Sequence, residues 1–368
     1  MRTTAAAARS GRTGRPDFAY GNTRLRARRP DLLDAAAYEA MIDRDLDGLL
    51  GALSTTPYAA DLDQAVTRYH GARRVHEAVR RHLGRTLEEM RSFYSGRARL
   101  LVDILLSRWD LQNTLVVIRA ESVRTKPDDA LAHVVPLGAF SDAVAREVAR
   151  QHELSGAIQL LVRWQLPDPE TAAALRSALA VYERVGDLAE LEQRVTASWT
   201  ARTSAELLRL GRDAAALLSH VQRDIDERNV TVALRLRTDD ELDEGLASHF
   251  LPGGVIAAAS LEAAVRGMEN GAVAGALTRL RPEWERALKR WAASGDLVQL
   301  QYDLDVVRVE AATKHFAFGD PLGIGIPVAY TVAKETEARN IRLIAEGTAR
   351  GLDRDRVRSR LLLPGSRR

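Results

Sequence analysis

The sequence of 368 residues contains no cysteine, which excludes disulfide bonds and thiolate metal sites. Aromatic residues make up only 5%, whereas alanine, leucine and arginine are abundant, and this balance favours helices over strands. The formal net charge is only +3, while a surface that binds nucleic acid usually concentrates positive charge. With 46% hydrophobic residues to build a core, the composition predicts an all-α protein and gives no support to a nucleic-acid partner.

Long apolar runs are also missing. Nowhere do about 18 uncharged apolar residues follow one another, as a helix that spans a bilayer requires. The first 16 residues are small and basic, and they lack the apolar stretch of a secretory signal. We therefore predict a disordered basic tail over residues 1–18, and if a membrane is involved, we expect the protein to lie beside it.

A pattern that occurs three times is the most informative feature of the sequence. The segments RWDLQNTLVVIRA, RDIDERNVTVALRL and KETEARNIRLIAEG align on an asparagine that follows an acidic residue by three positions. The asparagines lie roughly 110 to 120 residues apart, which indicates a repeated unit. The aligned residues are Asp110 and Asn113, Asp226 and Asn229, and Glu337 and Asn340.

Each of these segments has the spacing of an amphipathic helix, and the asparagine lies on the apolar stripe. A buried asparagine without partners costs roughly 1–3 kcal/mol for each unmet group, so all three should be hydrogen-bonded. We predict that the three acid–asparagine pairs fix the packing of helices. The alternative is that they contact a partner protein.

A looser block begins at Leu32, Val134 and Phe250 and precedes each asparagine helix. Further amphipathic stretches follow at 65–83, 171–191 and 203–221, and strict alternation typical of strands is absent. We predict three helical units over 19–122, 123–237 and 238–350. A C-terminal helix capped by Asp353 and a basic tail should occupy 351–368.

No arrangement typical of a catalytic, metal or cofactor site is present. The eight histidines include no pair four residues apart, the spacing of helical zinc sites. The segment FGDPLGIGIPVAY lacks the spacing of a phosphate-binding loop, so we expect a turn before the last long helix. No nucleophile, base and orienting residue can be grouped. We predict no cofactor, no metal and no catalytic activity.

Several motifs resemble the C subunit of archaeal and bacterial V/A-type ATPases, which is related to the eukaryotic vacuolar d subunit. The resemblance extends from Phe18 to Leu362. The residues that carry it are YGNTRLRARRPDLL, STTPYAADL, WDLQNTLVVIRA, IPVAYTVAKETEARNIRLIAEG and GLDRDRVRSRLL.

The resemblance implies a funnel of three similar helical domains around a pseudo-threefold axis. Such a subunit joins the central shaft of a rotary ATPase to the membrane proteolipid ring, in one copy per complex, and couples them for proton or sodium transport without catalysis of its own. It would be peripheral at the cytoplasmic face of the cell membrane and monomeric in isolation. The alternatives are a free-standing helical adaptor that binds another protein and a soluble helical enzyme.

Overall fold

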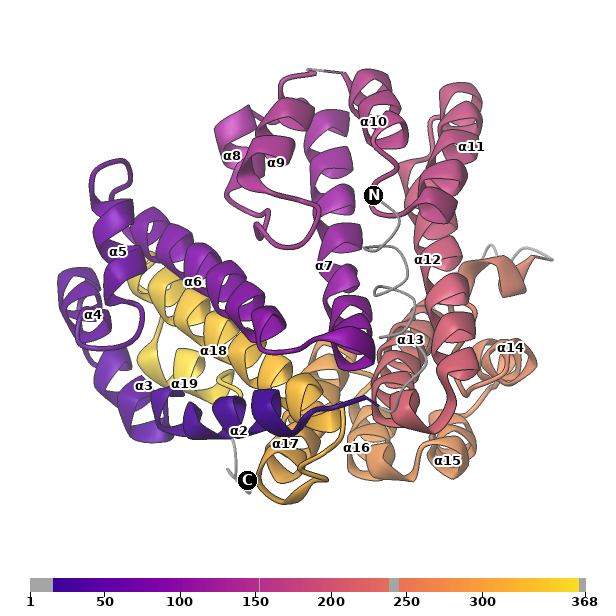
Figure 1. The fold of residues 1–368 in the computed structure, drawn as a ribbon. Helices are drawn as coiled ribbons and strands as arrows, with labels where there is room; N and C mark the ends of the chain where they lie inside the picture. Colours follow the sequence, from indigo (N-terminus) through magenta and orange to yellow (C-terminus); the bar gives the residue numbers. More distant parts are fainter. Residues whose placement is uncertain (1–15, 152, 238–244, 364–368) are drawn as a thin grey trace.

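The computed structural model describes residues 16–151, 153–237 and 245–363. Over these residues the chain is helical throughout, and the only β-type pairing is an isolated bridge between Leu137 and Phe140 (Figure 1). The all-α prediction is confirmed. Most of the predicted basic tail, namely 1–15, and the end of the C-terminal tail, 364–368, lie outside the described residues.

Eighteen α-helices and four short 3₁₀ helices are described along the chain. The first group comprises α2 (Ala19–Ala27), η1 (Arg29–Asp31), α3 (Ala35–Ile42), α4 (Leu46–Leu53), α5 (Ala59–Val66), α6 (Ala72–Ser92) and α7 (Gly96–Ser122). The second comprises α8 (Pro127–Leu131), α9 (Asp142–Ala149), α10 (Leu154–Arg163), α11 (Pro169–Val185), α12 (Leu188–Leu210), η2 (Gly211–Ala214) and α13 (Ala215–Leu236). The third comprises η3 (Leu246–His249), α14 (Ala258–Arg266), α15 (Asn270–Leu280), η4 (Pro282–Trp284), α16 (Glu285–Ser294), α17 (Leu297–Phe318), α18 (Gly325–Ala349) and α19 (Arg354–Ser359).

Three long helices, α7, α13 and α18, carry the repeated asparagines, and each follows another long helix through a short turn. The expected turn before the last long helix is confirmed, because residues 319–324 connect α17 to α18. The C-terminal helix begins as predicted, since the Asp353 carboxylate accepts the N–H of Arg356 at 2.8 Å.

Glycine interrupts the amphipathic stretches 65–83, 171–191 and 203–221. Gly71, Gly186 and Gly211 stand before α6, after α11 and after α12, each with φ between 61° and 77°. A residue with a side chain rarely adopts this backbone conformation, so glycine ends one helix and lets the chain turn into the next. The hydrophobic periodicity continues across these breaks because both helices face the same core.

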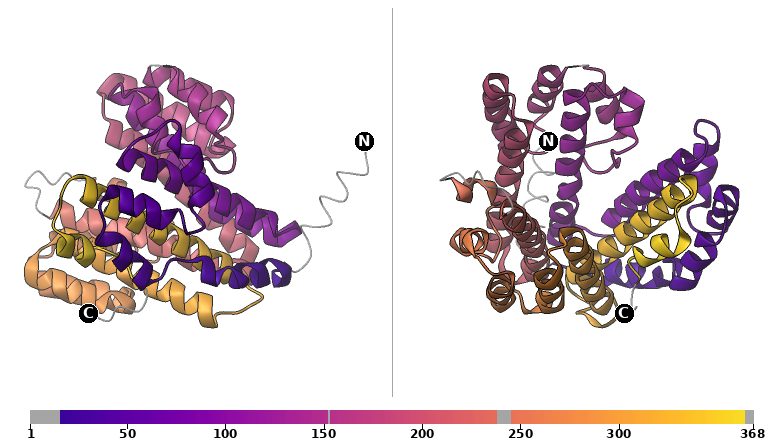
Figure 2. Two further views of the ribbon diagram at one scale, coloured as in Figure 1. Left: turned by 90° about the vertical axis from the view of Figure 1, so that its left-hand side faces the viewer. Right: turned by 180° about the vertical axis from the view of Figure 1, so that it is seen from behind.

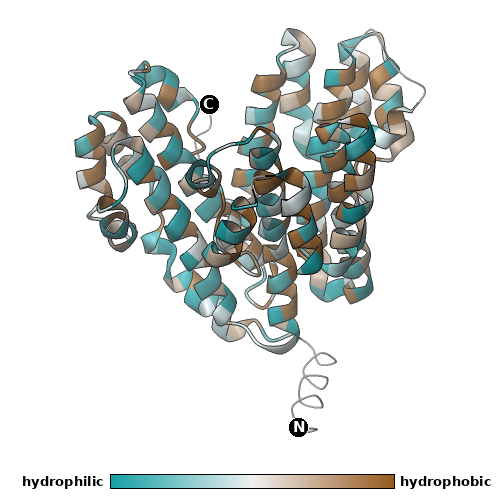
Figure 3. Ribbon diagram, turned by 90° about the horizontal axis from the view of Figure 1, so that it is seen from above, coloured by the Kyte–Doolittle hydropathy of each residue, from teal (hydrophilic) through white to brown (hydrophobic). Residues whose placement is uncertain are grey.

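The core consists of three large hydrophobic clusters that share the long helices. Residues 111–118 of α7 pack with α9 to α12, whereas the earlier part of α7 packs with α2 to α6. Residues 230–234 of α13 pack with the helices that follow, and α18 packs against α6 and α17. Helices α7 and α13 therefore each join two clusters, whereas α18 belongs to the same cluster as the first part of α7. The groups of helices spread from a common region (Figures 1 and 2). Figure 3 shows hydrophobic and hydrophilic residues alternating along most helices.

Candidate functional site

The three repeated asparagines make the same contact. Each side-chain amide donates to the carbonyl oxygen and accepts from the N–H of one residue, 22 positions further along the chain. All six N···O distances lie between 2.7 and 3.0 Å, and all three asparagines are buried. The pairs are Asn113 with Val135, Asn229 with Leu251, and Asn340 with Leu362.

Proline explains why two of these bound residues need side-chain partners. Pro136 and Pro252 follow Val135 and Leu251, and a residue before proline favours an extended backbone. Its N–H and C=O groups then cannot join a helical ladder, although both are buried and require partners. The asparagine amide supplies one donor and one acceptor in a single side chain.

The acidic residue of each repeat also accepts a hydrogen bond from a backbone N–H. Asp110 accepts the N–H of Phe140 at 3.2 Å, Asp226 that of Ile256 at 3.1 Å, and Glu337 that of Leu33 at 3.1 Å. Each donor comes immediately before the N-cap of a short helix, α9, α14 or α3. We call each acid and asparagine, with the backbone they bind, a clamp, and number the clamps in chain order.

The third clamp joins the two ends of the described chain. In the first and second clamps, the bound residues are five positions apart on one loop. In the third, Asn340 binds Leu362 near the C-terminus, whereas Glu337 binds Leu33 near the N-terminus. The two end segments together thus provide the backbone groups that a single loop provides in the first and second clamps. The third clamp thereby links the last unit of the chain to the first, and we call this a closed series of clamps.

The charges around the three acids differ. Asp226 pairs with Arg281, and Glu337 pairs with Lys334 at 2.5 Å and accepts the hydroxyl of Tyr58 at 2.7 Å. Asp110 has no ion pair among the contacts of the described residues, and burial raises its pKa to about 7, against the opposing effect of backbone N–H donors. The first clamp therefore titrates near neutrality.

Glycine lets the loops lie against the first two acids. A Cβ atom at Gly138, which has a φ of 64°, would lie 3.0 Å from a carboxylate oxygen of Asp110. At Gly254 it would lie only 2.1 Å from an oxygen of Asp226. Only a residue without a side chain permits this approach at Gly254.

A second set of equivalent residues meets where the long helices cross. Arg108, Asp224 and Glu335 each stand five positions before the asparagine of their repeat. One guanidinium nitrogen of Arg108 lies 3.4 Å from Asp224, and another lies 2.6 Å from Glu335. We call these three residues the charged junction. The three residues occupy equivalent positions on three helices. The arginine on one helix bridges the two acids on the others.

Burial perturbs the groups next to the charged junction. The pKa of Glu227 is raised to about 8, first by burial and then by the charge of Asp224. Burial lowers the pKa of His220 to about 4, so the imidazole is neutral at pH 7 although it lies 3.7 Å from Asp224. Burial also raises the pKa of Glu335. The interior where the helices cross is thus ionised only in part.

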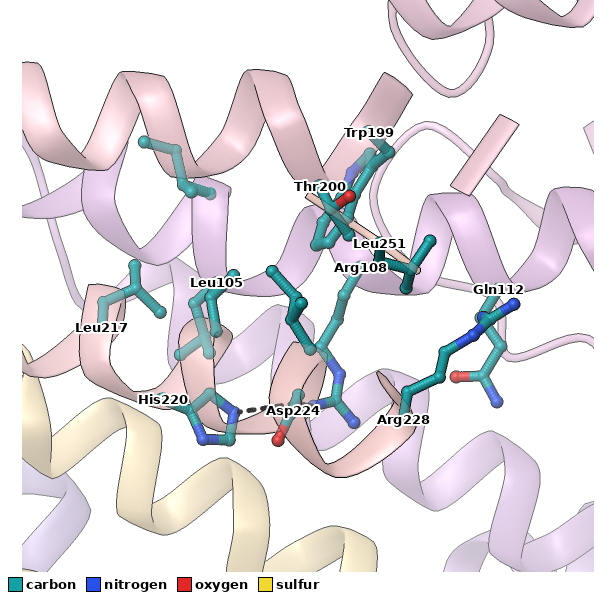
Figure 4. Close-up of a pocket in the computed structure, with 13 residues that line it drawn as sticks. Leu105, Arg108, Gln112, Trp199, Thr200, Leu217, His220, Asp224, Arg228 and Leu251 are labelled. Carbon is teal, nitrogen blue, oxygen red and sulfur yellow. Dashed lines mark hydrogen bonds and ion pairs between the residues drawn. The ribbon is translucent and has the colours of Figure 1, made fainter. Parts of the chain in front are cut away.

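A cavity of about 200 Å³ lies beside the charged junction, between α7, α12 and α13. Figure 4 shows Arg108 between Trp199 and Asp224, with Gln112 and Arg228 on one side and Leu105 and Leu217 on the other. The hydroxyl of Thr200 donates to a carbonyl of its own helix. Among the described residues, no group of three or more His, Asp or Glu could hold a metal ion.

Sequence reasoning singled out all three acid–asparagine pairs but missed the charged junction. The six predicted residues do not form one site: they belong to three separate clamps. The missed signal was present in the alignment of the repeats, because an arginine at one position and acids at the two equivalent positions would attract one another if the helices met.

The fold and these sites define a helical protein whose buried polar groups serve to hold helices together around a common junction. Residues 21–360 match the family described as ATP synthase (C/AC39) subunit, so the chain belongs to that family, and the resemblance predicted from its motifs is confirmed.

Curated relatives match over nearly the whole chain. The C subunit of the V-type ATP synthase of Thermus thermophilus is 29% identical over 357 residues, which cover 95% of this chain and 99% of the relative. The C subunit of the A-type ATP synthase of Haloferax volcanii is 25% identical over 354 residues, with coverage of 95% and 99%. The V-type counterpart of Deinococcus radiodurans is 26% identical over 343 residues, with coverage of 93% and 90%. These similarities support a subunit of a rotary ATPase.

Proposed function

We propose that this chain is the central-stalk rotor subunit of a V/A-type rotary ATPase, which joins the central shaft to the membrane proteolipid ring and is itself non-catalytic. Membership of the ATP synthase (C/AC39) family over residues 21–360 carries the proposal. The three units 19–122, 123–237 and 238–350 would surround a pseudo-threefold axis as a funnel, with one copy per complex. The closed series of clamps and the charged junction support this arrangement.

The mechanical role follows from how the clamps are built. A rotor connector must pass torque from one end to the other without opening. Close-packed helical interiors deform little, and each clamp fixes backbone groups to a long helix through at least three hydrogen bonds. In the first two clamps all of these bonds are buried. The third clamp holds the chain ends together, so that torque applied to one unit is distributed over all three.

The proposal also places the protein at the cytoplasmic face of the cell membrane. None of the described helices combines the length and apolar composition that crossing a bilayer requires. Attachment would then depend on the ring and on surface contacts.

Co-expression with the shaft and proteolipid subunits of the same organism tests the assignment. We expect a stable complex containing one copy of this chain, counted by native mass spectrometry after gentle extraction of the ring. The triple variant Val123→Ser/Val185→Ser/Met268→Ser, which changes scattered exposed side chains, tests whether assembly depends on exposed apolar residues in general. If the folded wild-type chain assembles with neither shaft nor ring, the rotor assignment is wrong and a free-standing adaptor becomes the better explanation.

A further inference from the structure

A second cavity, of about 280 Å³, lies between α13, α17 and α18. Its polar lining comes from two arginines, two histidines and one serine, and the rest consists of alanines, valines and a single glycine. Of the described residues that line it, none is acidic. The five polar residues are Ser219, His220, Arg223, Arg308 and His315. We call this space the basic cavity.

The cavity beside the charged junction provides a contrast within the same molecule. His220 lines both cavities, so they are neighbours on α13. In the first cavity Asp224 forms part of the wall, and the Arg108 beside it already bridges two acids. The positive charge of that wall is therefore matched by the wall itself. An anion that entered the basic cavity would meet only cationic and neutral groups.

Arg223 has donors that the protein leaves unused. Its guanidinium lies 3.9 Å from Glu283, too far for a hydrogen bond, and Glu283 also lies 3.5 Å from Arg281. The Nε atom of Arg223 is buried and has no hydrogen-bond partner within the described ranges. A buried cation whose donors lack partners is costly, and an anion that joins it offsets the cost.

Arg308 supplies the second cation from α17. One terminal nitrogen pairs with Asp305 on the same helix, and its buried Nε has no hydrogen-bond partner in the described part of the chain. The acids next to the two arginines, namely Asp224, Asp305 and Glu283, do not line the basic cavity. They hold the guanidinium groups from behind and leave the cavity side open.

The start of α18 adds backbone donors. Gly325, the first residue of this helix, lines the basic cavity, and no side chain caps the helix there. The first N–H groups of a helix lack partners within it, and its dipole favours negative charge at this end. The imidazole of His315 lies against Gly325, since a Cβ atom at Gly325 would lie only 1.8 Å from its Nε2. His220 is only 5% exposed, and its Nε2 has no hydrogen-bond partner among the residues described.

We propose that the basic cavity binds a phosphate group, held by Arg223, Arg308 and the start of α18. The planar guanidinium group matches the oxygens of an oxoanion, and helix N-termini bind phosphate. The donors come from three helices and therefore surround the group from several sides, which suits a tetrahedral anion better than a planar carboxylate. Bound phosphate would join α13 to α17 and α18. The inference uses only contacts within this chain and does not depend on the proposed function.

Titration calorimetry and thermal unfolding of the full chain test the proposal. We expect inorganic phosphate to bind saturably and to raise the melting temperature, whereas sodium chloride at the same ionic strength should not. ADP and a short-chain phosphatidic acid carry a phosphate group on a larger molecule. Tighter binding of one of them identifies a nucleotide or a lipid headgroup as its source, and weaker binding of both identifies the free anion. If none of the three binds saturably, the proposal is overturned.

Two variants locate the binding in the basic cavity. Arg223→Gln removes a cation, and Ala311→Leu fills the space without changing charge; each should weaken binding of inorganic phosphate at least about tenfold. The matched controls, Arg176→Gln and Ala173→Leu, change exposed residues of α11 and should bind as the wild type does. Circular dichroism confirms that each variant is folded. If either cavity variant binds phosphate as its control does, the proposal is overturned.

Discussion

Replacing Asn229 by alanine removes the side chain that holds the loop of the second clamp. The N–H and C=O of Leu251 then lose their partners, at 2.7 and 2.9 Å, inside a buried region. Each unmet group costs about 1–3 kcal/mol if it stays dry. Leu251 also lines the cavity beside the charged junction, so water can reach it and reduce the loss. Two unmet groups would together cost about 2–6 kcal/mol, so we expect the free energy of unfolding to fall by about 2–3 kcal/mol, the lower part of that range.

Urea denaturation followed by circular dichroism measures this loss, and hydrogen exchange at the Leu251 amide reports the local opening. Asn270→Ala is the control, because Asn270 is only half-buried and its side chain accepts a single bond from Arg237. Asn340→Ala makes a second comparison: it removes the partners of both buried backbone groups of Leu362, at 2.9 and 3.0 Å, and should speed hydrogen exchange at the Leu362 amide. An Asn229→Ala protein as stable as Asn270→Ala would refute the reasoning.

Three further changes test the clamps and the junction. Arg108→Leu removes the cation that bridges the two acids of the charged junction and should lower the free energy of unfolding by about 2–3 kcal/mol, measured by urea denaturation. The loss should not be larger, because these side chains keep partial access to water. Burial raises the pKa of Glu227 from 4.5 to about 8, so between these values the folded chain keeps a proton that the unfolded chain releases. Stability should therefore fall as the pH rises from about 4.5 to about 8. Denaturation curves of Glu227→Gln at pH 5 and pH 8 should lack the loss of stability that this proton causes. Gly254→Ala should destabilise the protein because its Cβ would overlap the Asp226 carboxylate, whereas Gly275→Ala, in an open position on α15, should raise the melting temperature slightly.

The helical class and the repeat could be predicted because both depend on local spacing. Hydrophobic residues at helical intervals identify a buried face, and a buried asparagine on that face must find partners. The alignment therefore located Asn113, Asn229 and Asn340 without a structure. It did not reveal their partners, because a contact between residues 22 positions apart leaves no periodic trace.

Helix boundaries were harder to predict, because hydrophobic spacing does not record a change of direction. The stretch 171–191 reads as one amphipathic segment, yet Gly186 ends α11 and the chain reverses before α12. The periodicity persists across the turn because both helices bury residues in the same cluster. Glycine was the signal available, but glycine occurs 25 times in the chain, and most of those within the described residues carry no such turn.

By itself the sequence determined the all-α class, the threefold recurrence of an acid and an asparagine, and the family, since each is recorded in residue identity and spacing. Only the tertiary structure decided that Leu33 and Leu362 complete the third clamp, and that Arg108 lies between Asp224 and Glu335. The reason is physical: local propensity acts over one or two helical turns, whereas these contacts join residues more than a hundred positions apart or opposite chain ends. Such pairs meet only when the packing of whole helices brings them together.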